Sequence, residues 1–225
     1  MYVKYFKRIL DIIFSFGALI AFSPIFLLLI ILGAVQMKGN PFFVQKRPGL
    51  NERVISLIKF RTMTNEKDEK GRLLPDDKRL NKYGRILRST SLDELPELLN
   101  ILKGDLSFVG PRPLLVNYLP YYTEQERHRH DVRPGLTGLA QVNGRSFITW
   151  EEIFAYDTEY VKNLSFTMDI KIIMHTIRKV LMRKDIADAS SVEKNSDGQW
   201  YVEVKGEKLR LHQPLNIERG GVNVK

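Results

Sequence analysis

Hydrophobic residues gather in one uncharged run near the N-terminus, from Ile12 to Met37. As a straight helix this run would reach about 39 Å, which is enough to cross a hydrocarbon core of about 30 Å. Ser23 and Pro24 interrupt it near the middle, where the proline leaves the carbonyl of Ile20 without its amide partner. We expect the Ser23 hydroxyl to donate to the carbonyl of Leu19 and to bend the helix further. The pattern therefore predicts a kinked helix.

Basic residues flank this run on both sides: Lys4, Lys7, Arg8, Lys38, Lys46 and Arg47. Because positive charge is retained on the cytoplasmic side of a membrane, a helix that dips into one leaflet and returns accounts for both flanks, whereas a straight span would carry one flank across. We therefore predict a re-entrant membrane helix over residues 1–38. An ordinary span that tolerates the proline remains open. So does a signal peptide, although the run is long for one and lacks a small-x-small cleavage site.

The remaining pattern predicts one compact, α-rich α/β domain over residues 39–188. Phe42 to Gln45 and Val54 to Phe60 are typical of short strands, and residues 64–82 are charged and aperiodic, as in a loop. Helical periodicity predicts helices at Tyr83–Arg88, Leu95–Lys103, Leu114–His130, Trp150–Asn163 and Met168–Arg183. The last two combine an apolar stripe with Lys and Arg, which suits either an amphipathic helix in the membrane interface or a helix that faces a protein core.

Composition narrows the chemistry that this domain can perform. A chain of 225 residues with 44% hydrophobic content can bury one principal core, and the composition changes after residue 189. Within this C-terminal extension, residues 189–225, the stretch QWYVEVKGEKLRL alternates like a β-hairpin. The net charge of +9 favours anionic partners, namely nucleic acid, lipid headgroups or phosphorylated small molecules. The absence of cysteine excludes disulfides, cysteine nucleophiles and thiolate metal sites.

Two adjacent acids, Asp93 and Glu94, stand just ahead of an apolar helical segment. One interpretation is helix capping, because Ser91 and Glu94 have the spacing of a capping box and acids are stabilised in a first helical turn. The alternative follows from Pro96, which is favoured at the first helical position and not in a helix interior. A helix that begins near Pro96 would leave both acids projecting from the preceding turn, free for chemistry. Spacing alone leaves both interpretations open.

Basic residues in neighbouring motifs favour phosphate chemistry: Lys59, Arg61, Arg85, Arg88, Arg112, Arg133 and Arg145. Flanking prolines fix the backbone around Arg112 and suit its guanidinium to a bidentate hold on phosphate. Cations around a carboxylate favour its ionised form, so Asp93 is expected to act as a nucleophile or a metal ligand and not as an acid. A carboxylate together with phosphate oxygens is also the usual environment of Mg²⁺.

These motifs occur in a recognisable order. RSTSLDELPELLNILKGDLSFVGPRP, KFRTM, RPGLTGLAQVNGR and the hydrophobic segment with its Ser-Pro break closely resemble the bacterial sugar transferase family, the monotopic phosphoglycosyl transferases, from Lys7 to about Lys184. The resemblance implies transfer of a phosphosugar from a UDP-sugar to undecaprenyl phosphate at the cytoplasmic face of the bacterial inner membrane, with release of UMP. The chain resembles the minimal members that start glycoconjugate assembly with a di-N-acetylated bacillosamine phosphate, which implies an N-acetylated donor.

The resemblance also implies roles for single residues. Asp93 would attack the sugar-bearing phosphorus to form an aspartyl phosphosugar and would bind Mg²⁺, and Glu94 would assist the lipid phosphate or the metal. Covalent catalysis of this kind divides one displacement into two and needs cations to neutralise charge. The expected substrate-binding residues are Lys59, Arg88, Arg112, Arg145 and Asp157. For Asp157 a plain helix-surface acid is the alternative, and the i, i+2 spacing of His128 and His130 argues against a metal site there.

Other functions compete with this one. A non-catalytic basic membrane adaptor would explain the charge, the anchor and the amphipathic helices, but not the two acids together with the GPRP motif. A nucleic-acid binder is not favoured, because the sequence has no helix-turn-helix, RNP or zinc signature. Among enzymes, UDP-glucose or UDP-galactose is the alternative donor. Expected partners are the UDP-sugar, undecaprenyl phosphate and membrane lipids, and downstream glycosyltransferases and a second copy of the chain, as a homodimer, are further candidates.

Overall fold

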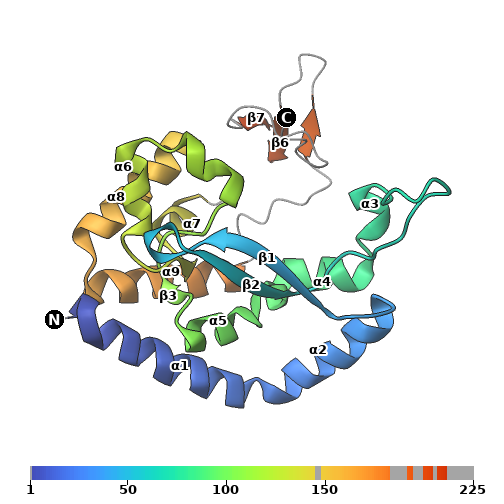
Figure 1. Cartoon of the computed structure of the whole chain (residues 1–225), viewed down its shortest axis with the longest axis horizontal. Helices are drawn as coiled ribbons and strands as arrows, with labels where there is room; N and C mark the ends of the chain where they lie inside the picture. Colours follow the sequence, from blue (N-terminus) through green and yellow to red (C-terminus); the bar gives the residue numbers. More distant parts are fainter. Residues whose placement is uncertain (1, 145–147, 183–191, 195–199, 205–206, 212–225) are drawn as a thin grey trace.

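Two helices at the N-terminus form one edge of the molecule. The computed structural model describes residues 2–144, 148–182, 192–194, 200–204 and 207–211. A π-helical turn over Tyr2–Phe6 leads into α1 (Lys7–Ala21), and α2 (Ser23–Gln36) follows after a single residue. Figure 1 shows α1 and α2 as a bent rod that runs along the rest of the domain. The predicted N-terminal helical segment is therefore present, in two parts.

The bend between α1 and α2 measures 65°. Within the described residues no single helix is both long and apolar enough to cross a membrane, and this pair passes that test only when the two helices are taken together. The Ser23 hydroxyl donates to the carbonyl of Ile20 at 2.8 Å, and not to Leu19 as expected. Pro24 has no amide hydrogen, so the carbonyl of Ile20 lacks its usual donor four residues on, and it accepts instead from the Ser23 hydroxyl and from a backbone N–H at the end of α1. The kink is confirmed, and the re-entrant course in a membrane stays a prediction.

Polar contacts lock α1 to the domain. Arg8 donates from Nη1 and Nη2 to the carbonyls of Ile101 and Leu102, at 2.5 and 2.7 Å. These carbonyls lie in the last turn of α5 (Glu97–Lys103), where few backbone donors remain, although the Ile101 carbonyl also accepts from the Gly104 amide at 3.0 Å. The buried Asp11 carboxylate accepts from the Ser107 hydroxyl and from the Phe108 backbone amide, both in β3 (Ser107–Val109) and both at 3.1 Å. The N-terminal helix is thus part of the folded domain.

An antiparallel ribbon of β1 (Phe42–Pro48) and β2 (Val54–Phe60) lies against α5 and places Phe43 opposite Lys59. The first core cluster joins β2 to α5 and the segment after it, through Ile55, Leu57, Leu98, Ile101 and Leu106, and Ala18 and Leu19 of α1 pack against it. A second cluster joins α2, β2 and α4 (Lys82–Thr90) through Leu29, Phe60 and Leu87. Both N-terminal helices therefore contribute to the core around the ribbon.

The second half of the chain adds a parallel pair and two longer helices. β3 pairs with β4 (Gly135–Thr137), the short α7 (Leu139–Asn143) follows, and α8 (Trp150–Asn163) and α9 (Phe166–Met182) complete this half. Their core consists of Val109, Val142, Tyr160 and Ile172. A capping box between Thr149 and Glu152 sets the start of α8, where the sequence predicted it.

Two predicted elements differ from the structure. Residues Leu114 to His130 were expected to form one helix, but they form a 3-10 segment (Val116–Tyr121), α6 (Glu124–Arg127) and a 3-10 turn (His128–His130). Pro120 interrupts the pattern, and a capping box between Thr123 and Glu126 starts a new helix. The charged segment 64–82 contains a short helix, α3 (Asp76–Arg79). The overall class, α-rich with short strands, is as predicted.

The C-terminal extension contains a small sheet. β5 (Val192–Lys194), β6 (Trp200–Val204) and β7 (Glu207–Leu211) pair in the order β5-β6-β7, and both pairings are antiparallel. The two strands of the predicted hairpin are therefore present as β6 and β7. The turn between them, residues 205–206, lies outside the described residues.

Candidate active site

The two adjacent acids lie on a sharp turn between α4 and α5. The last residue before the turn, Ser91, adopts a left-handed conformation with φ of 57°, and a 3-10 turn over Leu92–Glu94 follows. Pro96 prevents a continuous helix because it has no amide hydrogen for the carbonyl of Leu92, and α5 begins one residue later. Leu92 and Leu95 pack into the core, so the intervening acids point away from it.

This local geometry decides between the two interpretations of the acids. The Ser91 side chain makes no capping hydrogen bond, and its backbone is not that of an N-cap residue at the start of an α-helix. The capping-box interpretation is therefore wrong. The alternative, in which Asp93 and Glu94 project from a turn ahead of Pro96, agrees with the structure.

Glu94 is held by two cations from different elements. Its Oε1 accepts from Lys59 Nζ at 2.8 Å and from Arg112 Nη2 at 2.7 Å. Lys59 comes from the end of β2 and also reaches Glu97 of α5 at 3.0 Å. Glu97 is 2% exposed and is therefore the buried member of this group of charged side chains. Sequence reasoning missed Glu97, although the spacing of three acids in DELPE was a signal for it.

Asp93 differs from its neighbour in surroundings and acidity. Among the described residues its carboxylate has no ion pair within 4.0 Å. Burial, and next the negative charge of Glu94, raise the pKa of Asp93 to about 6, against the influence of Lys59 and Arg88. We expected the surrounding cations to favour its ionised form, and the structure corrects this because desolvation outweighs them. Asp93 is nevertheless mostly ionised above pH 6.

The pKa values of Glu94 and Glu97 are shifted in opposite directions. Burial opposes the ionisation of Glu94, but Arg112 and Lys59 together outweigh it and lower the pKa of Glu94 well below its usual range. Burial and the charge of Glu94 raise the pKa of Glu97. The site therefore holds one carboxylate as a fixed anion beside a second, Asp93, whose charge is neutralised by no direct partner in the described residues.

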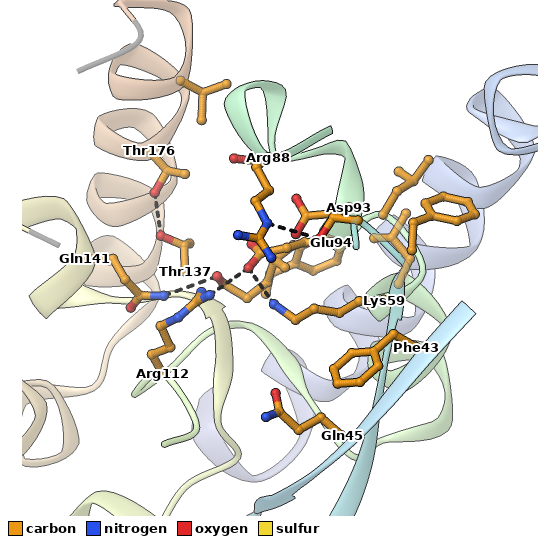
Figure 2. Close-up of a pocket in the computed structure, with 18 of the residues that line it drawn as sticks. Phe43, Gln45, Lys59, Arg88, Asp93, Glu94, Arg112, Thr137, Gln141 and Thr176 are labelled. Carbon is orange, nitrogen blue, oxygen red and sulfur yellow. Dashed lines mark hydrogen bonds and ion pairs between the residues drawn. The ribbon is translucent and has the colours of Figure 1, made fainter. Parts of the chain in front are cut away.

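A cavity of about 1060 Å³ opens over the acids. Figure 2 shows Lys59, Arg88 and Arg112 converging on Asp93 and Glu94, and all five residues line the cavity. Two further cations, Arg61 and Arg79, also line it. Apolar lining residues come from α1, the break after it, β4 and α9, namely Ala18, Phe22, Leu136, Ile173, Ile177 and Val180. The volume reaches the upper end of the range for small-molecule sites.

Several lining residues were not predicted. Arg79 belongs to the segment 64–82 that was interpreted as a loop, and Gln45 of β1 had no distinctive context in the sequence. Thr137 and Gln141 also line the cavity, and both lie in the motif RPGLTGLAQVNGR, which was the available signal for them. The glycines of this motif permit close approach, because a Cβ on Gly135 would come within 2.1 Å of the backbone nitrogen of Gly110.

Asp157 does not lie where a substrate-binding residue would. Its side chain is 1% exposed, it does not line the cavity, and it pairs with Arg129. The structure thus corrects its predicted role from contact with substrate to support behind the site. Arg145, the remaining predicted substrate-binding residue, lies outside the described residues.

The described residues contain no group of three or more His, Cys, Asp or Glu side chains placed to hold a metal ion. Asp93 fits as one oxygen ligand, because its carboxylate is free of ion pairs in the described part of the chain, whereas Glu94 is occupied by Lys59 and Arg112. A divalent cation here would need its other ligands from phosphate oxygens and water.

Comparison with known proteins places the chain in a family. Residues 2–183 match the family described as "Bacterial sugar transferase". The "Uncharacterized sugar transferase EpsL" of Bacillus subtilis is 51% identical over 186 residues, which cover 83% of this chain and 92% of that protein. The chain therefore belongs to the bacterial sugar transferase family.

Two relatives carry more specific names. The "UDP-glucose:undecaprenyl-phosphate glucose-1-phosphate transferase" of Klebsiella pneumoniae is 41% identical over 80% of this chain. The "Undecaprenyl-phosphate galactose phosphotransferase" of Salmonella typhimurium is 35% identical over 81% of this chain. In each case the match covers 41% of the relative, so the chain corresponds to less than half of these two proteins.

Proposed function

We propose that this protein transfers a phosphosugar from a UDP-sugar to undecaprenyl phosphate, releases UMP and leaves a polyprenyl diphosphate sugar. The observation that carries this proposal is the pair of adjacent acids in a cation-lined cavity. Glu94 is neutralised by Lys59 and Arg112, whereas Asp93 faces the same cavity without a direct partner among the described residues. The relatives named for this chemistry with glucose or galactose support the reaction class.

The mechanism uses Asp93 as a covalent nucleophile. A carboxylate oxygen of Asp93 attacks the sugar-bearing phosphorus, the bond from this phosphorus to the bridging oxygen breaks, and UMP leaves with that oxygen. The product on the protein is an aspartyl phosphosugar. An oxygen of undecaprenyl phosphate then attacks the same phosphorus and releases the Asp93 carboxylate. Splitting one displacement into two steps is the general advantage of a covalent nucleophile.

The cations around the acids have a defined part in this scheme. Arg112 uses only Nη2 for Glu94 among the described residues, and its side chain is 45% exposed, so further N–H groups remain for a phosphate. Arg88 donates from Nε to Thr62 at 3.0 Å, which fixes the remainder of its guanidinium at the cavity wall. Asp93 would be the protein's ligand to Mg²⁺, which when bound would supply neutralisation of the negative charge on the transferred phosphoryl group.

We further propose that α1, α2 and α9 hold the protein at the cytoplasmic face of the bacterial inner membrane, with α1 and α2 re-entrant. Exposed apolar side chains lie along α1 and α2, including Ile13, Phe16, Leu27, Ile31 and Val35. Because α1 and α9 contribute apolar residues to the cavity lining, a lipid phosphate would reach the acids from the side of these helices. The net charge of +9 favours anionic lipid surfaces.

The identity of the donor sugar is the most specific part of the proposed reaction. An N-acetylated sugar follows from the resemblance to the small family members, and glucose or galactose follows from the names of the two relatives. The first experiment therefore measures UMP release from a panel of UDP-sugars with Mg²⁺ and undecaprenyl phosphate in lipid particles. Wild type is compared with Asp93→Asn, Glu94→Gln and the control Glu124→Gln, which changes an exposed acid on α6.

We expect release with at least one donor, loss of release in Asp93→Asn and full activity in Glu124→Gln. Without the lipid acceptor, wild type should release at most one UMP per protein and gain the mass of the phosphosugar on a peptide that contains Asp93. No release with any donor from a folded, membrane-bound preparation would reject transfer and favour the adaptor interpretation. Release that persists in Asp93→Asn would reject the covalent step alone.

A further inference from the structure

A buried ion pair lies directly behind the active-site loop that carries Arg112. Arg129 is 2% exposed and Asp157 is 1% exposed. Arg129 donates from Nε and Nη2 to Asp157 Oδ2, at 3.0 and 2.6 Å. Neither residue lines the cavity, and the catalytic scheme uses neither of them. Removing two charges from water is costly, so their presence here needs a reason.

The guanidinium of Arg129 does more than neutralise Asp157. Its Nη2 also donates to the backbone carbonyl of Arg112 at 2.8 Å, and its Nη1 donates to the Tyr122 hydroxyl at 3.2 Å. The rings of Tyr122 and Phe154 lie 5.8 and 5.6 Å from its central carbon. Arg129 is therefore fixed from several directions, and one of its hydrogen bonds fixes the backbone of Arg112.

We propose that Arg129, oriented by Asp157, positions Arg112 so that its guanidinium meets Glu94 and the substrate phosphate. This rests on the proposed function. Pro111 and Pro113 stiffen the loop, but neither can donate a backbone hydrogen bond, so the orientation of the loop must be set by other contacts. Arg129 supplies such a contact at the carbonyl of Arg112, one residue away from both prolines. Arg129 is thus a positioning residue that acts through Arg112.

Stability gives no sufficient reason for the pair. Burial raises the pKa of Asp157, and the attraction to Arg129 offsets this only in part. Buried ion pairs can often be replaced by apolar pairs of similar volume without loss of stability, whereas removal of one partner is strongly destabilising. Replacing both charges together therefore separates a positioning role from a role in folding.

The test compares the double variant Arg129→Met/Asp157→Leu with wild type, in lipid particles, for melting temperature and for kcat/KM of UMP release. The matched control is Arg127→Met/Glu52→Gln, which removes a neighbouring Arg–Glu pair at 2.6 Å whose side chains are 42% and 31% exposed. We expect the double variant to fold but to lose kcat/KM by about 100-fold, because small displacements of a positioning group have effects of this size. The control should keep wild-type activity.

A mutant cycle with Arg112→Gln identifies the route of the effect. If Arg129 acts through Arg112, the loss caused by the double variant should nearly vanish when Arg112 is already replaced. Wild-type kcat/KM in the double variant, or an equal loss in both backgrounds, would overturn the proposal. If the double variant does not fold, Asp157→Asn goes through the same cycle, because it keeps the shape of the side chain and weakens its hold on Arg129.

Positioning of Arg112 by Arg129 should also affect UMP binding, which does not depend on transfer. UMP carries a phosphate group and binds without any transfer step, so its affinity for the folded protein can be measured even if no donor supports turnover. We expect the double variant and Arg112→Gln to weaken UMP binding to a similar degree, without adding to each other. Unchanged UMP affinity in the double variant, alongside weakened affinity in Arg112→Gln, would contradict the positioning role.

Discussion

The pKa values of the adjacent carboxyl groups of Asp93 and Glu94 are shifted in opposite directions. Glu94 is a fixed anion because Lys59 and Arg112 both contact it, whereas burial without a direct partner raises the pKa of Asp93 to about 6. A nucleophile with a pKa near the working pH combines a large ionised fraction with high basicity. The division of roles between the two acids therefore follows from their contacts.

The pKa of Asp93 predicts the pH dependence of the reaction. Attack requires the ionised carboxylate, so kcat/KM for UMP release should be level above about pH 7 and should fall by about tenfold per pH unit below about pH 6. A pH series on wild type measures this limb, and melting temperatures over the same range exclude unfolding as its cause. A rate that stays level down to pH 5 would contradict the raised pKa.

The same shift predicts a cost in stability. A carboxyl whose pKa rises from 3.8 to about 6 on folding stabilises the folded state below about pH 4, and this contribution is lost as the pH rises through 6. Asp93→Asn should therefore raise the free energy of unfolding at pH 7.5, by at most about 3 kcal/mol. The gain should disappear at pH 4. Chemical denaturation at both pH values measures it, and a destabilised variant at pH 7.5 would contradict the argument.

Sequence motifs identified the three cations that converge on the two acids, because Lys59, Arg88 and Arg112 belong to patterns that are recognisable in the linear chain. They did not reveal the acidity of Asp93, which depends on burial by elements distant in sequence. They also misplaced Asp157, because its pairing with Arg129 joins α8 to a turn 28 residues earlier. Burial and long-range pairing are properties of the fold and not of a motif.

At the scale of elements, the bend between α1 and α2 has a local cause. Pro24 cannot donate the amide hydrogen bond that the carbonyl of Ile20 would receive in a regular helix, and this carbonyl accepts instead from the Ser23 hydroxyl and from a backbone N–H at the end of α1. We expect Pro24→Ala to restore the amide bond and to straighten the segment, which would then be long enough to span a bilayer.

Accessibility labelling tests this directly, since the chain has no cysteine of its own. Cysteines placed at positions 4 and 40 should both be labelled from the cytoplasmic side in the parent protein. With Pro24→Ala, a fraction of molecules should protect one position from the cytoplasm. Labelling of the two positions from opposite sides in the parent protein would reject the re-entrant course.

Local sequence patterns predicted the helices and strands whose first and last residues are clearly marked. The prediction was wrong where the residues that end or start a helix were overlooked. Val54–Phe60 and Trp150–Asn163 form with the predicted bounds, because β-branched alternation marks the strand and a capping box marks the helix. Leu114 to His130 was interpreted as one helix from its periodicity, although Pro120 and Thr123 carry the signals of a break and a new start. Residues that break or start a helix therefore decide its bounds more strongly than the spacing of apolar residues does.

At the scale of the whole molecule, α9 presents an apolar stripe to its surroundings. Phe166, Ile170 and Met174 are 51%, 43% and 59% exposed, whereas Ile172 on the other side is 2% exposed. If the stripe contacts lipid, Ile170→Asn/Met174→Asn should weaken binding to vesicles that contain anionic lipid, with no fall in melting temperature. A sedimentation assay measures binding, and Lys171→Arg, an exposed change on the same helix that keeps the positive charge, is the control. Unchanged binding would assign the stripe to another contact.

The contacts of α1 and α2 with the domain have a consequence for how this protein can be handled. Arg8 and Asp11 satisfy backbone groups of α5 and β3, and Leu29 shares a core cluster with Phe60 and Leu87. Deleting the N-terminal helices to obtain a water-soluble enzyme would therefore expose that core and leave polar groups unpaired. A soluble form is better sought by recoding only the outward side of these helices, as one would redesign the surface of a globular protein while leaving its interior intact.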